Sequence, residues 1–116
     1  MTKREVVKAF KEDRVGRCAN AETKPNSLTL YGWVIAELDK HNELWIATNG
    51  INSRTTLSWV NLVLNEFRIT AHVSNVKGHL SLGGFPWDGN PVNVESWLYQ
   101  QRRKHDNTET VATGIS

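Results

Sequence analysis

The segment 28–67 constrains the fold most, because it alternates like two strands and then becomes periodic like a helix. In residues 44–48, Leu44, Ile46 and Thr48 alternate with Trp45 and Ala47, as the side chains of a half-buried strand do. Before this stretch, the polar run 40–42 ends at Asn42, whose short side chain tolerates the positive φ of a three-residue turn. We therefore predict an antiparallel hairpin built from strands over 28–38 and 43–48.

The register of this hairpin divides its side chains between two unlike faces. The apolar face holds Val34, Ala36, Leu38, Leu44, Ile46 and Thr48. The opposite face is rich in rings and holds Tyr31, Trp33, Ile35, Trp45 and Ala47. Three large aromatic side chains on one face need either a cover or a ligand. The cover could be the N-terminal helix or the C-terminal helix, or the face could be free for a partner.

A helix follows the hairpin, with Ser53 as its N-cap. Its apolar side chains recur at helical spacing at Leu57, Val60, Leu64 and Phe67. We expect this helix to close over the apolar face of the hairpin.

The rest of the chain completes one α+β domain over 1–105. The predicted elements are a helix over 2–13 opened by a Thr2/Glu5 capping box, a linker over 14–27, strands at 68–74 and 79–82, a helix over 90–105 opened by Asn90-Pro91, and a disordered tail over 106–116. The hairpin, the central helix and the two later strands form a ββαββ unit over 28–89. We therefore expect a four-stranded antiparallel sheet flanked by N- and C-terminal helices.

No group of residues in the sequence forms a catalytic or metal-binding motif. Cys18 is the single cysteine, which excludes an internal disulfide and a cysteine zinc cluster. His72 and His79 lack a further Cys, Asp or Glu at ligand spacing. Asp88 fits a turn better than the role of a general base. We expect a protein that is not an enzyme and that uses neither a cofactor nor a metal.

Composition agrees with an ordinary soluble domain that does not enter a membrane. No apolar run reaches the ~18 residues that a bilayer span requires. The formal net charge is only +2, so an acidic mimic of DNA is excluded as well. The positive charge is concentrated at the two ends of the chain: residues 1–27 carry seven Lys and Arg against four acids, and Arg102-Arg103-Lys104 stand together.

Short motifs within residues 28–89 resemble those of small uncharacterised bacteriophage proteins. The shared features are a strand ending in Ile35-Ala36, a second strand with Leu44 and Ile46, a helix start at Ser53-Arg54-Thr55-Thr56 running into Asn61, and Trp87-Asp88-Gly89 downstream. The resemblance implies a phage origin, expression in the cytoplasm of a bacterial host, and accessory rather than virion-building work. It supplies no catalytic residues.

Two functional hypotheses follow. The first is an inhibitor that binds a host protein or an antiviral-defence protein, of the anti-restriction or anti-CRISPR type, through Tyr31, Trp33 and Trp45. A homodimer that buries the same rings is compatible with it.

The second hypothesis is a small phage nucleic-acid-binding protein. Its phosphate contacts would come from the basic ends of the chain: Lys3, Arg4, Lys8, Lys11, Arg102, Arg103 and Lys104. The N-terminal helix could instead be an ordinary solvated helix, because its basic residues are interleaved with acids.

Overall fold

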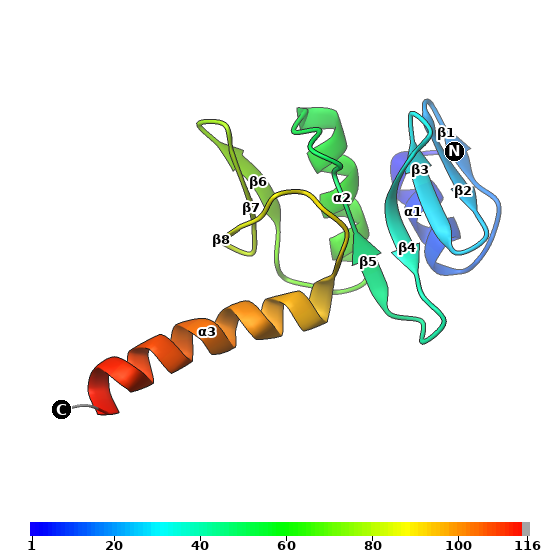
Figure 1. The fold of residues 1–116 in the computed structure, drawn as a ribbon. Helices are drawn as coiled ribbons and strands as arrows, with labels where there is room; N and C mark the ends of the chain where they lie inside the picture. The colour runs from blue at the N-terminus through cyan, green and yellow to red at the C-terminus, as the bar shows by residue number, and fades with distance from the viewer. Residues whose placement is uncertain (115–116) are drawn as a thin grey trace.

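The computed structural model describes the backbone of residues 1–114 and the side chains of residues 1–104 (Figure 1). Its helices are α1 (Lys3–Lys11), α2 (Arg54–Glu66) and α3 (Val94–Gly114). Its strands are β1 (Arg17–Cys18), β2 (Ala21–Lys24), β3 (Ser27–Leu30), β4 (Trp33–Leu38), β5 (Leu44–Ile46), β6 (Val73–Val76), β7 (His79–Leu82), β8 (Phe85–Pro86) and β9 (Val92–Asn93). The α+β class is confirmed.

The strands form two separate antiparallel sheets, so the prediction of one four-stranded sheet is wrong. Sheet A has six strands in the order β1-β2-β3-β4-β5-β9, and sheet B has three in the order β6-β7-β8. α2 stands between the two sheets in Figure 1. The two predicted strand pairs therefore lie on opposite sides of the central helix instead of joining edge to edge.

The predicted strand 28–38 is two strands joined by a tight turn. Tyr31 and Gly32 have φ values of 52° and 81° between the paired residues Leu30 and Trp33. Positive φ at both central residues is the signature of a type I′ hairpin turn. Tyr31 therefore lies in a turn and not on the face of a continuous strand.

The predicted linker 14–27 also contains strands. β2 pairs with β3 through the turn Pro25-Asn26, in which Asn26 has a φ of 60°. Proline followed by a residue of positive φ is typical of a type II turn. The prediction missed β2 because its polar sequence, Ala-Glu-Thr-Lys, lacks the apolar alternation of a strand.

The hairpin register and the local caps are confirmed. Ala36 pairs with Ile46, Leu38 pairs with Leu44, and Asn42 has a φ of 62°. The Ser53 side chain accepts a hydrogen bond from the Thr56 amide at 3.3 Å. The Thr2/Glu5 capping box is present as well, although α1 ends at Lys11.

A β-bulge changes which face some β4 residues occupy. Leu28 pairs with Ala36 and Thr29 pairs with Val34, so Ile35 is an extra residue on β4. Val34 is consequently 42% exposed, against the prediction that it lies on the covered apolar face, and Ile35 is only 2% exposed.

The core forms where α1 and α2 pack against sheet A. Buried side chains of both helices join those of the strands in one cluster, which includes Val6, Val7, Phe10, Leu28, Ala36, Ile46, Val60, Val63 and Leu64. Leu57 and Leu64, predicted to face the hairpin, belong to this cluster, while Phe67 packs against it partly buried. The predicted role of the central helix is thus confirmed.

The last helix begins and ends later than predicted. The Asn93 side chain, not that of Asn90, accepts a hydrogen bond from the first turn, at 3.2 Å from the Ser96 amide. Asn90 instead donates from its amide and its side chain to the Asp88 carboxylate, and Val92–Asn93 form β9 at the edge of sheet A. α3 continues past His105 to Gly114, across most of the predicted tail, because no proline or glycine interrupts 106–113. Residues 115–116 lie outside the described residues.

Within the described part of the chain, no helix is both long enough and apolar enough to cross a bilayer.

Candidate functional site

Two aromatic side chains stand exposed where β3 turns into β4. Tyr31 is 60% exposed and Trp33 is 58% exposed, and Val34 beside them is 42% exposed. A groove of about 330 Å³ opens next to this turn. Its walls include Gly32, Trp33, Val34, Glu37, Trp45 and Pro91. The aromatic face is defined here as Tyr31, Trp33, Val34 and Trp45.

The structure brings the three predicted binding residues to the same region but gives them different environments. Trp33 and Trp45 both line the groove, whereas Tyr31 is adjacent to it through Gly32 and is not part of its wall. Trp45 is half-buried. Neither terminal helix covers Tyr31 or Trp33, because both rings keep more than half of their surface exposed.

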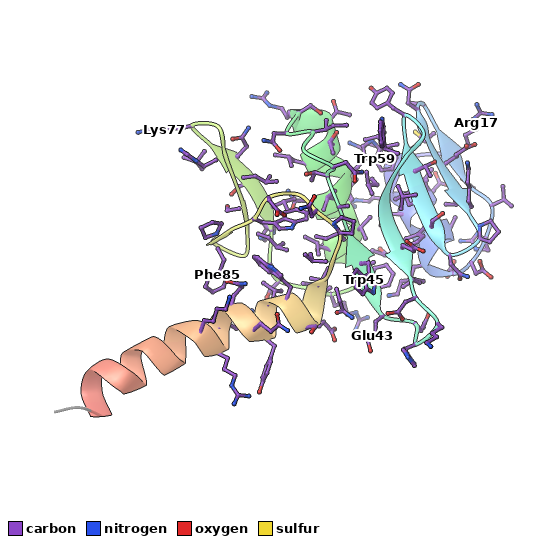
Figure 2. All side chains as sticks on the ribbon, in the orientation of Figure 1. Arg17, Glu43, Trp45, Trp59, Lys77 and Phe85 are labelled. Carbon is purple, nitrogen blue, oxygen red and sulfur yellow. The ribbon has the colours of Figure 1, made fainter. Side chains whose placement is uncertain are left out.

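The Trp45 indole is held in place by Asp39. Its Nε1–H donates to Asp39 Oδ2 at 2.9 Å, and Asp39 Oδ1 accepts from the amides of His41 and Glu43 at 2.8 and 3.0 Å. The hydrogen bonds from the Trp45 indole, then from the Glu43 and His41 amides, hold the pKa of the Asp39 carboxyl below its ordinary value. Figure 2 shows Trp45 on β5, close to Glu43 and the end of the hairpin.

Asp39 is therefore expected to make the hairpin sensitive to acid. A carboxyl whose pKa is lowered by folding stabilises the fold above its unfolded pKa, and this stabilisation is lost as the pH falls through the folded pKa. We predict that Asp39→Asn is less stable than the wild type at neutral pH and that the difference shrinks on acidification. Urea unfolding between about pH 2 and pH 7 measures it.

The control for this prediction is Asp13→Asn. Asp13 is exposed, and its carboxylate accepts no hydrogen bond among the described residues. A stability difference between Asp39→Asn and the wild type that does not change with pH would contradict the prediction.

The wall of the groove opposite Trp45 is fixed by a loop. Asn49 lines the groove and donates from Nδ2 to the Val34 carbonyl at 3.1 Å. Its backbone amide and that of Thr48 both donate to the Gly89 carbonyl at 3.0 Å. Asn49 and Pro91 were not predicted as binding residues, because the sequence marks Asn49-Gly50 only as a loop before the helix.

The basic residues of α1 divide into two pairs. Lys3 donates to Ser58 Oγ at 2.9 Å and lies 4.9 Å above the Trp59 ring. Lys11 donates to the Glu66 carbonyl at 3.0 Å and contacts the Phe67 ring at 5.5 Å. Both lysines therefore attach α1 to α2. Arg4 and Lys8 are exposed, and their side chains make no such contact with α2 among the described residues.

The basic residues of α3 lie far from those of α1. Arg102, Arg103 and Lys104 are exposed, and Arg103 donates to the Tyr99 hydroxyl at 3.3 Å. Figure 1 shows α1 behind sheet A at one side of the molecule and α3 running away from the other side. The structure does not gather the seven predicted phosphate-binding side chains on one surface, and nucleic-acid binding stays a prediction.

The candidate reactive residues do not form a cluster. His72 and His79 are both exposed, and Cys18 is half-buried against the core. Among the described residues, no group of three His, Cys, Asp or Glu side chains could hold a metal ion.

Comparison with known proteins found no match to a protein-family model, to a curated protein or to a solved structure.

Proposed function

We propose that this chain is a bacteriophage accessory protein that works by binding, and that it inhibits a host protein or an antiviral-defence protein through the aromatic face. The observation that carries the proposal is the exposure of Tyr31 and Trp33 beside an apolar groove. Tryptophan and tyrosine contribute most to binding when a partner buries them in a well-packed pocket. The phage assignment rests on the resemblance of segment 28–89.

The backbone supports this proposal because hydrogen bonds fix the turn that carries Tyr31 and Trp33. The type I′ turn and the pairing of Leu30 with Trp33 fix both ends of the aromatic turn. The Tyr31 amide also donates to the Asn20 carbonyl at 2.9 Å, which ties the turn to the neighbouring β1–β2 turn. A preorganised backbone loses little conformational freedom when a partner binds the side chains that it carries.

Tyr31 also adopts a backbone conformation that is unfavourable for a residue with a large side chain. A left-handed backbone conformation costs an L-residue with a large side chain about 1 kcal/mol relative to glycine, and asparagine tolerates it better. Lys77 stands at the same position of the β6–β7 turn, with a φ of 53° followed by 82° at Gly78. The two turns therefore give a matched pair of sites, one with an exposed ring and one with a charged side chain.

We predict that Tyr31→Asn stabilises the fold while weakening partner binding. Asparagine before glycine is the preferred type I′ sequence, so the free energy of unfolding should rise by about 0.5–1 kcal/mol. Lys77→Asn should give a similar gain, because it makes the same change in the same kind of turn. Urea unfolding measures both variants.

The binding experiment uses immobilised protein and lysate of phage-infected bacteria. The wild type and Lys77→Asn should retain one partner in stoichiometric amount, and Tyr31→Asn and Trp33→Ala should both lose it. Tyr99→Ala, which removes an equally exposed ring from α3, should retain it. Retention of the same partner by all variants, or of none by the wild type, would contradict the proposal.

A further inference from the structure

A second and larger cavity lies on the other side of the loop that borders the aromatic face. Its volume is about 860 Å³, within the range of small-ligand sites. It is open to solvent and is bordered by the β6–β7 hairpin, the loop at 50–52, the segment 84–88 and the first turns of α3. In Figure 1 the chain after β8 crosses in front of α2 before it enters α3, and this crossing segment forms one wall of the cavity.

Two adjacent residues of this loop line different cavities. Asn49 lines the groove of the aromatic face, whereas Gly50 lines the larger cavity. The larger cavity is therefore a distinct site, and what it binds does not depend on the proposed role of the aromatic face.

Two indole rings form apolar walls of this cavity. Trp87 is 6% exposed and its Nε1–H donates to the Asn90 carbonyl at 3.1 Å, which fixes the ring. Trp97 is half-buried and meets Phe85 edge-on, with ring centroids 6.3 Å apart. Phe85 is labelled in Figure 2 next to α3. The half-buried Trp97 ring is thus the aromatic surface on which a planar group can stack, whereas Trp87 is almost wholly covered.

The Asp88 carboxylate at the cavity favours a cationic ligand that donates hydrogen bonds. Asp88 supplies a carboxylate, which the Asn90 amide and side chain hold at 3.0 and 2.9 Å. Asn52 also lines the cavity, but its Oδ1 is buried away from solvent without a hydrogen-bond partner among the described residues, so it is not an open acceptor for a ligand. No lysine or arginine stands among the described lining residues. The lining therefore carries the Asp88 carboxylate without a lysine or arginine beside it, together with His79, Ser81 and Gln101, whose side chains can donate as well as accept.

We propose that this cavity binds an arginine side chain presented by a polypeptide partner. A guanidinium is planar, carries five N–H donors and stacks on aromatic faces, so it can meet the Asp88 carboxylate and an indole ring together. An ammonium group is compact and strongly hydrated, and it stacks less well. An anionic ligand would face Asp88 without a compensating cation.

The test follows the indole N–H signals of Trp87 and Trp97 in ¹⁵N-labelled protein. The probe is the peptide acetyl-Gly-Arg-Gly-amide, and its neutral match carries citrulline in place of arginine. The arginine peptide should shift both signals to saturation, with a dissociation constant at least tenfold lower than that of the citrulline peptide. The lysine peptide should bind more weakly than the arginine peptide.

Protein variants test the same contact from the other side. Asp88→Asn keeps an oxygen for the Asn90 amide but removes the charge, and it should weaken arginine-peptide binding about tenfold or more. Asp13→Asn, an exposed aspartate after α1, should leave binding unchanged. Equal binding of the arginine and citrulline peptides to the wild type, or no shift at about 10 mM peptide, would overturn the proposal.

Discussion

Replacing Gly89 with alanine is expected to lower the free energy of unfolding by about 2–4 kcal/mol. Gly89 has a φ of 85°, a conformation that strains any residue with a Cβ. A Cβ at this position would also overlap Thr48 Oγ1 and lie 3.1 Å from the Gly50 backbone nitrogen. Thr48 is only 1% exposed, so its side chain has no free space into which it can move.

The structural consequence would extend to both cavities. The Gly89 carbonyl accepts hydrogen bonds from the amides of Thr48 and Asn49, and this pair holds the loop between the groove and the larger cavity. A shift of Gly89 away from Thr48 would weaken both hydrogen bonds. Thermal and urea unfolding measure the loss of stability.

Gly84→Ala is the matched control for the strain. Gly84 has the same φ of 85°, but a Cβ there would have no atom within 4 Å. It should cost only the conformational part, about 1 kcal/mol. An equal cost at the two glycines would show that the contact with Thr48 adds nothing.

A double variant isolates the contact itself. Thr48→Ala removes the overlapping Oγ1, which has no hydrogen-bond partner among the described residues. Combined with Gly89→Ala, it should recover a large part of the lost stability, as a favourable coupling in a double-mutant cycle. Strictly additive effects would contradict the proposed overlap.

The features that the sequence predicted correctly depend on short-range chemistry. Ser53 caps α2, Thr2 and Glu5 form a capping box, and Asn42 adopts positive φ, because in each case one side chain or one residue decides its own backbone environment. The pairing of Leu38 with Leu44 followed from that turn. These local rules were sufficient for the hairpin and the start of the helix.

The features that it missed depend on contacts between distant segments. Tyr31 interrupts an apolar run without any of the usual type I′ residues before its glycine, so 28–38 reads as one strand. The division into two sheets depends on where the second strand pair packs against α2, which no local pattern records. Asn93 caps α3 in place of Asn90 because the Asp88 carboxylate already binds Asn90.

The sequence pointed to Tyr31 and Trp33 as candidate binding residues but not to the geometry that exposes them. Tyr31 and Trp33 were selected as rings that need a partner, and both are exposed. The reason given was a shared strand face, whereas the turn and the bulge at Ile35 create the exposure. The cavity beside Trp87 was not predicted, because its walls come from segments up to about 50 residues apart.

Replacing Asn61 with alanine is expected to lower the free energy of unfolding by about 2–3 kcal/mol. Asn61 lies on α2 and makes two hydrogen bonds to the backbone of one β6 residue: its Nδ2 donates to the Val73 carbonyl at 3.0 Å, and its Oδ1 accepts from the Val73 amide at 2.8 Å. The Asn61 side-chain amide takes the place of a neighbouring strand at the open edge of β6. Alanine would leave both backbone groups of Val73 unpaired in a partly buried position.

Asn65→Ala is the control, one helical turn along α2 on an exposed side chain. Both substitutions gain the same helix propensity, so the difference between them reports the two hydrogen bonds. Asn61→Asp adds a second comparison, with a side chain of nearly equal volume. It keeps the acceptor and replaces the donor by an oxygen that faces the Val73 carbonyl. It should destabilise the fold at neutral pH at least as much as alanine does.

Hydrogen exchange locates the effect within the molecule. If Asn61 is the main polar tie between α2 and sheet B, its loss should speed amide exchange in β6 and β7 more than in β3 and β4. Sheet A keeps its core contacts with α1 and α2 in this variant, so its protection should fall only with global stability. Equal acceleration in both sheets, or a stability equal to that of Asn65→Ala, would show that sheet B is attached by its apolar contacts alone.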